Sequence, residues 1–139
     1  STTLAESLRV LSGEQRFGSA SSLIGQFVTG LADENGIHQS GIVEAIRFSD
    51  DGRPVLQLSN GGELPLEQLA RVEPPSRAAE ALIGQAVAGL DRRNRKEPAM
   101  AEGVVVGVRT EPSGEVLLEL DTGNDLRFRD VITVTPAGT

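Results

Sequence analysis

The chain has 139 residues, with 20 acidic and 13 basic side chains and a formal net charge of −7, so long-range repulsion of phosphate backbones disfavours nucleic acid as a partner. It contains no cysteine, which excludes disulfides, thiol catalysis and cysteine-ligated zinc. No stretch is long and apolar enough to span a bilayer and no signal peptide is visible, so no membrane partner is expected.

Residues 1–19 are predicted to form a short N-terminal helical segment. The TLAE sequence at residues 3–6 is a capping box, and Leu4, Leu8 and Leu11 then follow at helical spacing along one face. Phe17 extends this apolar stripe if the helix continues. The stripe either packs on the chain's own β-domain or reaches a partner chain, and Leu4, Leu8, Leu11 and Phe17 are therefore the candidate subunit interface.

The rest of the chain is an internal repeat. Residues 20–26 (ASSLIGQ) correspond to residues 79–85 (AEALIGQ) at an offset of 59, and after a three-residue insertion the offset of 62 holds to the end. Glycines recur at the same positions, which indicates shared turns. The predicted domains are unit one at 20–74, a linker at 75–78 and unit two at 79–139. Units of about 55 residues are small for an independent core, so we expect them to pack together or to oligomerise.

Both units show the same order of short β-strands. In unit one, strands are expected at 26–31, 41–48 and 54–58, then a strand starting at residue 63, a helical turn at 65–69 and a last strand at 70–72. The Asn60-Gly61-Gly62 turn favours a type I′ hairpin. Strict alternation fails within residues 42–48, which indicates a bulge.

Unit two repeats this order, with strands expected at 85–90, 103–109, 115–120, 125–128 and 132–134 and a turn at 129–130. Five short strands with one helical turn before the last are typical of an SH3-like or Tudor-like barrel. The predicted fold is mainly β, with tandem SH3-like/Tudor-like small barrels and a short N-terminal helix. The Pro74-Pro75-Ser76 linker is stiff and short, and Ser76 is expected to cap a brief helix that runs to Leu82.

Residues that could carry chemistry are few. His38 is the only histidine and is expected on the surface, with no second histidine to complete a metal site. The acidic turns at 50–52 and 121–125 lack the spacing of an EF-hand loop and are interpreted as tight turns. No phosphate-binding loop and no serine–histidine pair can be identified. We therefore expect no enzyme activity, no catalytic residues, no metal and no cofactor.

The aromatic residues are four phenylalanines, with no tyrosine or tryptophan. Phe27, Phe48 and Phe128 fall in predicted strands and are expected in the core. This leaves too few aromatic faces for a methylammonium cage, a proline-rich peptide groove or a single-stranded nucleic-acid platform.

A basic cluster, Arg92, Arg93, Arg95 and Lys96, lies near the three-residue insertion in unit two. One interpretation is a solvated loop, because surface loops commonly collect charge. The other is an electrostatic contact with an acidic neighbour, such as residues 33–34 or 50–51 of unit one.

Three phrases of unit one resemble bacterial flagellar hook-capping proteins. They are ASSLIGQFV at residues 20–28, GIVEAI at 41–46 and PLEQLARV at 65–72, in the order found in that family. The resemblance covers unit one and extends more loosely to LIGQAV at residues 82–87 of unit two.

This resemblance implies a scaffold for flagellar hook assembly, exported through the flagellar type III apparatus. The protein would form an oligomeric cap at the hook tip, with the hook subunit protein and further copies of itself as partners. The alternative is a cytoplasmic tandem SH3-like adaptor that binds a protein or structured RNA through the basic cluster.

Overall fold

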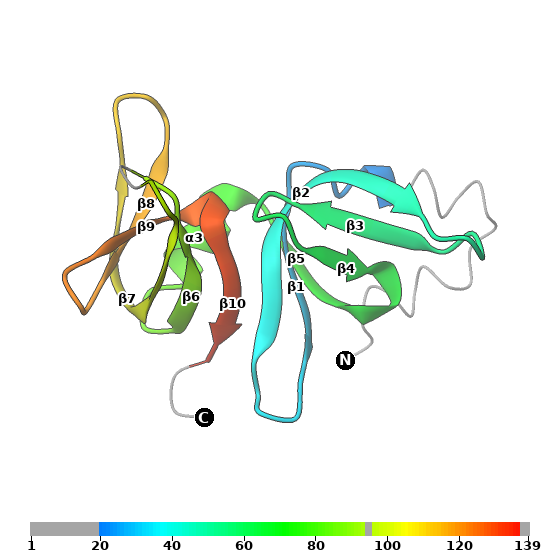
Figure 1. Cartoon of the computed structure of the whole chain (residues 1–139), viewed down its shortest axis with the longest axis horizontal. Coiled ribbons are helices and arrows are strands. Elements are labelled where there is room, and N and C mark those ends of the chain that lie inside the picture. Colours follow the sequence, from blue (N-terminus) through cyan, green and yellow to red (C-terminus); the bar gives the residue numbers. More distant parts are fainter. Residues whose placement is uncertain (1–19, 94–95, 137–139) are drawn as a thin grey trace.

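A computed structural model describes residues 20–93 and 96–136 of the chain (Figure 1). The candidate interface residues Leu4, Leu8, Leu11 and Phe17 lie outside the described residues, as does Arg95 of the basic cluster. The described part is mainly β, as predicted, and its strands form one open antiparallel sheet.

Unit one contains β1 (Phe27–Ala32), β2 (His38–Phe48), β3 (Pro54–Leu58), β4 (Glu63–Pro65), η1 (Leu66–Gln68) and β5 (Leu69–Glu73). The strands β1 to β4 pair in sequence, and β5 returns to pair with β1, so the order is β5-β1-β2-β3-β4. The predicted strands are confirmed, although β2 begins at His38 rather than at Gly41.

Unit two contains α3 (Pro75–Ala81), β6 (Ala86–Asp91), β7 (Ala99–Thr110), β8 (Val116–Leu120), β9 (Asp125–Arg127), η2 (Phe128–Asp130) and β10 (Val131–Thr135). Its strand order is β10-β6-β7-β8-β9, which matches unit one strand for strand. The pairing register shifts between Val43 and Ala45 in β2, so the bulge predicted for unit one is present, and an equivalent shift lies between Val105 and Gly107 in β7 of unit two.

The Asn60-Gly61-Gly62 hairpin forms, but its predicted turn type is wrong. The Gly61 N–H donates to the Leu58 carbonyl and the Leu58 N–H donates to the Gly62 carbonyl. Gly61 alone of the two glycines has a positive φ, 87°. This pattern is a type I turn followed by a left-handed glycine, which makes a one-residue bulge. The same pair of hydrogen bonds closes the loops at Gly36, Gly52, Gly114 and Gly123.

The helix α3 begins earlier than its predicted cap. Pro74 is the N-cap residue and Pro75 is the first helical residue, with no side-chain capping bond from Ser76. Proline is suited to this position because its fixed φ is helical and its missing N–H has no partner there. Residues 75–78 are therefore part of α3 rather than a linker, and Ala78 and Ala79 are buried.

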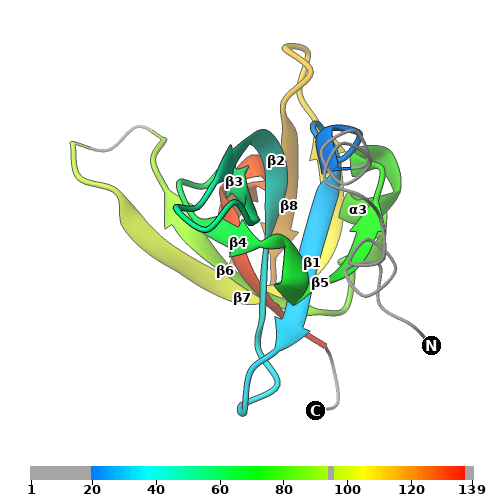
Figure 2. The ribbon, with the colours of Figure 1, turned by 90° about the vertical axis from the view of Figure 1, so that its right-hand side faces the viewer.

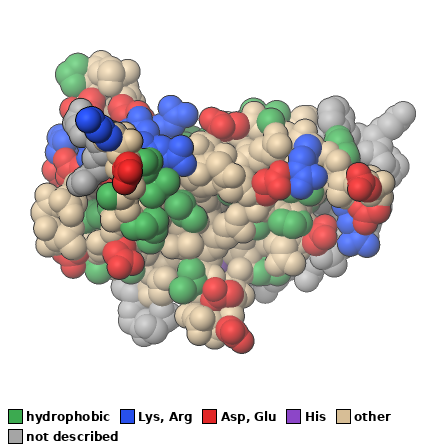
Figure 3. All heavy atoms as spheres, in the orientation of Figure 1, with side chains coloured by type: hydrophobic (Ala, Val, Ile, Leu, Met, Phe, Trp, Pro, Cys, Tyr) green, Lys and Arg blue, Asp and Glu red, His purple; other side chains and the backbone are tan. Residues whose placement is uncertain are grey.

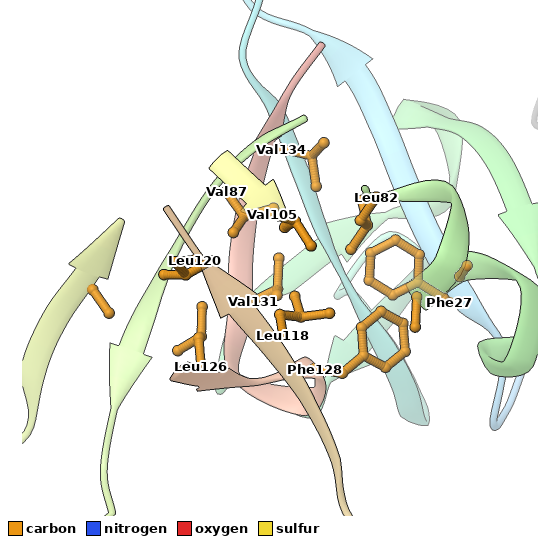
Figure 4. Close-up of a cluster of buried hydrophobic side chains, with 13 residues drawn as sticks. Phe27, Leu82, Val87, Val105, Leu118, Leu120, Leu126, Phe128, Val131 and Val134 are labelled. Carbon is orange, nitrogen blue, oxygen red and sulfur yellow. The ribbon is translucent and has the colours of Figure 1, made fainter. Parts of the chain in front are cut away.

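Two hydrophobic clusters form the core. The first, built on Val28, Val43, Leu56 and Leu64, lies within unit one. The second belongs to unit two but also contains Phe27 from β1 of unit one. Figure 4 shows Phe27 beside Phe128 and Leu82 in this second cluster.

Phe48 is not in the core, so its predicted burial is wrong. Its side chain is 45% exposed, because it lies beyond the bulge at the outer end of β2, opposite Pro54. Phe27 and Phe128 are each 3% exposed, as expected for core residues.

Candidate functional site

Two kinds of contact join the two units at one junction: pairing between strands and stacking of aromatic rings. Thr133 and Val134 of β10 pair with Gln39 and His38 of β2, so the sheet runs from one unit into the other (Figures 1 and 2). Beside this pairing, the rings of Phe27 and Phe128 stack with centroids 4.8 Å apart and an interplanar angle of 29°. The junction therefore extends the core of unit two onto the outer face of unit one.

Polar side chains of the β3–β4 hairpin also cross the junction. The Asn60 Nδ2 amino group donates to the Ser40 carbonyl at 2.7 Å and to the Val131 carbonyl at 2.6 Å. The Ser59 hydroxyl donates to the Arg129 carbonyl at 2.8 Å. The bonds to Val131 and Arg129 fix the position of the hairpin relative to β10 and η2 of unit two, and the bond to Ser40 ties Asn60 to β2 of its own unit.

A groove of about 260 Å³ lies along the junction, between the outer face of unit one and α3 with β10. His38 lines it and is half-buried rather than on the surface, with its Nδ1 2.8 Å from the Gly30 carbonyl oxygen. The ion pair of Arg71 and Glu73, 2.8 Å apart, also lines it. A histidine bound to a backbone carbonyl can fix local structure.

Among the described residues of the basic cluster, Arg93 makes contacts within its own unit. The Arg93 guanidinium lies 3.4 Å from the Asp91 carboxylate and donates to the Asp125 carbonyl at 2.9 Å. Arg92 and Lys96 are exposed. Arg93 therefore contacts Asp91 of β6 and Asp125 of β9 in its own unit, and not the acidic turns of unit one that were one of the two interpretations of the cluster.

The acidic turns use their carboxylates for local hydrogen bonds. Asp33 accepts from the N–H groups of Asn35 and Ile37 at 2.8 and 3.0 Å. The hydroxyl of Ser49 donates to Asp51, which lowers the pKa of that carboxyl from its ordinary value. Across the described residues, no group of three or more histidine or acidic side chains is arranged to hold a metal ion.

Corresponding ion pairs brace the outer strands of both units. Arg47 binds the Glu63 carboxylate through two nitrogens, one at 2.9 Å, and this hydrogen bonding lowers the pKa of Glu63. Arg109 occupies the equivalent position in unit two and donates to Asp125 at 3.0 Å, which raises the pKa of Arg109. The side chains of Arg47, Glu63, Arg109 and Asp125 are all partly exposed to solvent. Each ion pair therefore adds little stability by itself.

Unit two also carries a partly exposed apolar surface that the sequence analysis did not single out. Alternation along β6 turns Ala86, Ala88 and Leu90 outward, while Val87 and Gly89 between them are buried. Across the strands, Leu90 pairs with Met100 and Ala86 pairs with Val104. We call Ala86, Ala88, Leu90, Met100 and Val104 the β6–β7 face. Period-two alternation was the signal available in the sequence.

Met100 is the most exposed of these side chains, at 63%. Figure 3 shows hydrophobic side chains gathered over the second unit, where β6 lies in Figure 1. The other four side chains of the β6–β7 face are half-buried, so this face is only partly open to solvent.

No protein-family model matches this sequence, and no curated protein shows significant similarity to it. Among the described residues, no helix has the length and apolar character needed to cross a membrane.

Proposed function

We propose that this chain is a structural scaffold for flagellar hook assembly, an oligomeric cap beneath which hook subunits polymerise. The observation that carries the proposal is the spatial arrangement of the three phrases that resemble hook-capping proteins. They lie far apart in the sequence, but all three meet at β1.

Backbone hydrogen bonds join the phrases directly. The Gly25 N–H in the first phrase donates to the Val43 carbonyl in the second at 2.8 Å, and the Val43 N–H donates to the Gln26 carbonyl at 3.0 Å. Val72, at the end of the third phrase, is paired with Val28 of the first. The phrases therefore form one structural unit, which supports a shared fold as the reason for the resemblance.

The finer architecture proposed is two SH3-like or Tudor-like barrels in tandem. In both units the last strand follows a short 3₁₀ turn and pairs with the first strand, and the remaining strands form a meander. This strand order is the support for the barrel assignment. The junction then makes the two barrels a single elongated building block.

A scaffold role accounts for the kinds of residue found at the junction and in the groove. The junction is built from aromatic stacking, strand pairing and side-chain bonds to backbone carbonyls. Such contacts fix relative positions, and position is what an assembly cap must supply. In this proposal the protein is not an enzyme, it is exported to the hook tip, and its partners are the hook subunit protein and other copies of itself.

The alternative adaptor function relied on the basic cluster as its contact surface. Arg93 in that cluster is already bound to Asp91 and to the Asp125 carbonyl. No observation on the described residues favours the adaptor over the scaffold.

The test is deletion of the encoding gene, followed by motility assays and electron microscopy of the cell surface. The proposal expects cells without completed hooks, hook protein in the culture medium, and rescue by the intact gene. Normal hooks in the deletion strain would refute the scaffold function, provided that the genome holds no second copy of the gene.

A further inference from the structure

Unit one contains two asparagine–glycine sequences, Asn35-Gly36 and Asn60-Gly61. They occupy the same position in two turns of the same kind, because in each turn the glycine N–H donates to the carbonyl three residues earlier at 3.0 Å. Both glycines have a positive φ, 77° and 87°. Asparagine before glycine is prone to deamidation, because glycine has no side chain to hinder its backbone nitrogen from reaching the asparagine amide. The two turns therefore present one reactive sequence in matched backbones.

The side chains of the two asparagines are held differently. Asn35 is exposed, and its amide has no hydrogen-bond partner among the described residues. Asn60 is half-buried, and its Nδ2 donates to the carbonyls of Ser40 and Val131 at 2.7 and 2.6 Å. Its Oδ1 accepts from the Gly62 N–H at 2.7 Å. Since Val131 belongs to unit two, the junction helps to hold this amide in place.

The turn itself does not require the Asn60 amide. Thr122-Gly123 stands at the equivalent position of unit two, where Gly123 has a φ of 89° and its N–H donates to the Leu120 carbonyl at 3.0 Å. The same turn therefore forms with threonine in place of asparagine. What the amide adds in unit one is the bond to Val131 across the junction.

Deamidation at residue 60 begins with attack of the Gly61 backbone nitrogen on the Asn60 side-chain carbon Cγ. The N–Cγ bond forms as the Cγ–Nδ2 bond breaks, and ammonia leaves with the proton of the Gly61 N–H, so a cyclic imide results. Water then opens the imide at either carbonyl, which gives an aspartate or an isoaspartate. The attack requires the amide to leave its three hydrogen bonds and turn toward Gly61, so the closed junction opposes it.

We propose that Asn60 is a deamidation site controlled by the junction, protected while the junction is closed and reactive when it opens. Reaction then hinders closure, because a carboxylate oxygen in place of Nδ2 faces the carbonyl oxygens of Ser40 and Val131. Both of these residues are 0% exposed, and a buried acceptor without a donor is costly. An isoaspartate also lengthens the backbone of the turn by one methylene. The inference goes beyond the proposed function and does not rest on it.

Mass spectrometry of the purified 139-residue chain, incubated in mildly alkaline buffer and digested with trypsin, tests the protection. Cleavage after Arg47 places the two asparagines in different peptides, so Asn35 serves as an internal standard. In the folded chain Asn60 should deamidate at least about tenfold more slowly than Asn35, because three hydrogen bonds must break first. In guanidinium chloride the two rates should become similar, which controls for the different preceding residues. Equal rates in the folded chain would overturn the inference.

Variants at the junction test whether its opening controls the reaction. Phe27→Ala leaves the turn unaltered and should raise the Asn60 rate by about tenfold or more, with no change at Asn35. Val134→Ala is a smaller change at a buried residue of the same junction and should raise the rate less. Phe48→Ala is the matched control, because Phe48 lies outside both core clusters, and it should change neither rate. Circular dichroism checks that each variant is folded. An unchanged Asn60 rate in the folded junction variants would contradict control by the junction.

The Asn60→Asp variant reproduces one product of the reaction. Hydrogen exchange of the β10 amides should be at least about tenfold faster in this variant than in the unaltered chain. It should also be faster than in Asn60→Ala, which removes the donor but adds no negative charge. Exchange in β10 as slow as in the unaltered chain would show that the carboxylate does not hinder closure, and the proposal would fail.

Discussion

Replacing Phe27 with alanine tests whether the two units share one core. Phe27 belongs to β1 of unit one, yet it is 3% exposed and packs within the hydrophobic cluster of unit two. Truncating a buried phenylalanine costs about 3–5 kcal/mol in unfolding free energy. Its stacking on Phe128 at 4.8 Å should account for about 0.5–1.5 kcal/mol of that loss.

The assay is urea unfolding followed by circular dichroism, because the chain has neither tryptophan nor tyrosine for fluorescence. With a slope of about 2 kcal/mol per molar urea, the loss corresponds to a midpoint lower by about 1.5–2.5 M. Phe48→Ala is the matched control, since Phe48 is 45% exposed. The control should lose less than about 1 kcal/mol, as is usual for a surface position.

A double-mutant cycle with Phe128→Ala isolates the contact across the junction. The two changes should be non-additive by about 0.5–1.5 kcal/mol, because each removes the partner of the other. Strict additivity would show that the rings contribute independently. If Phe27→Ala cost no more than Phe48→Ala, the shared core itself would be refuted.

Three further changes follow from the geometry. Asn60→Ala removes two bonds to backbone carbonyls, one in each unit, and should cost about 1–3 kcal/mol, with faster hydrogen exchange in β10 as the readout. A Cβ at Gly89 would lie 2.3 Å from the Asp130 carbonyl oxygen, so Gly89→Ala should lower the melting temperature more than Gly30→Ala, whose nearest atom is a side-chain carbon at 2.9 Å. The folded-state pKa of Glu63 lies below its ordinary value of 4.5, so its contribution is present above that pH and lost as pH falls through the lower value. Glu63→Gln should therefore show a smaller loss of melting temperature between neutral and acid pH than the unaltered chain.

The strands and turns were predictable because their signals are local. Five hairpin loops have glycine at their fourth position, where the backbone needs a positive φ, and Gly36, Gly52, Gly61, Gly114 and Gly123 mark the strand ends there. The bulge in β2 was visible as a break in alternation between Ile42 and Phe48. The same pattern in both units predicts the same order of strands along the chain in each.

The junction was not predictable because it depends on contacts between residues that are distant in sequence. Phe27 and Phe48 both sit in strands of similar pattern, yet one is buried by unit two and the other faces solvent. His38 is half-buried because β10 pairs beside it, and nothing near residue 38 signals that pairing. Ser76 is of a residue type that favours helix caps, but α3 starts at Pro75.

The way the two units differ follows from which surfaces are covered. Five pairs of equivalent positions carry the same residue in both units and are buried in both: Val28 and Val87, Val43 and Val105, Leu56 and Leu118, Leu58 and Leu120, and Leu64 and Leu126. Positions at the outer face differ, with Phe27 and Ser40 in unit one replaced by Ala86 and Glu102 in unit two. These five positions meet similar surroundings in both units, whereas Phe27 packs against the other unit and its counterpart Ala86 does not. The junction therefore requires an aromatic ring at residue 27, and no equivalent contact requires one at residue 86.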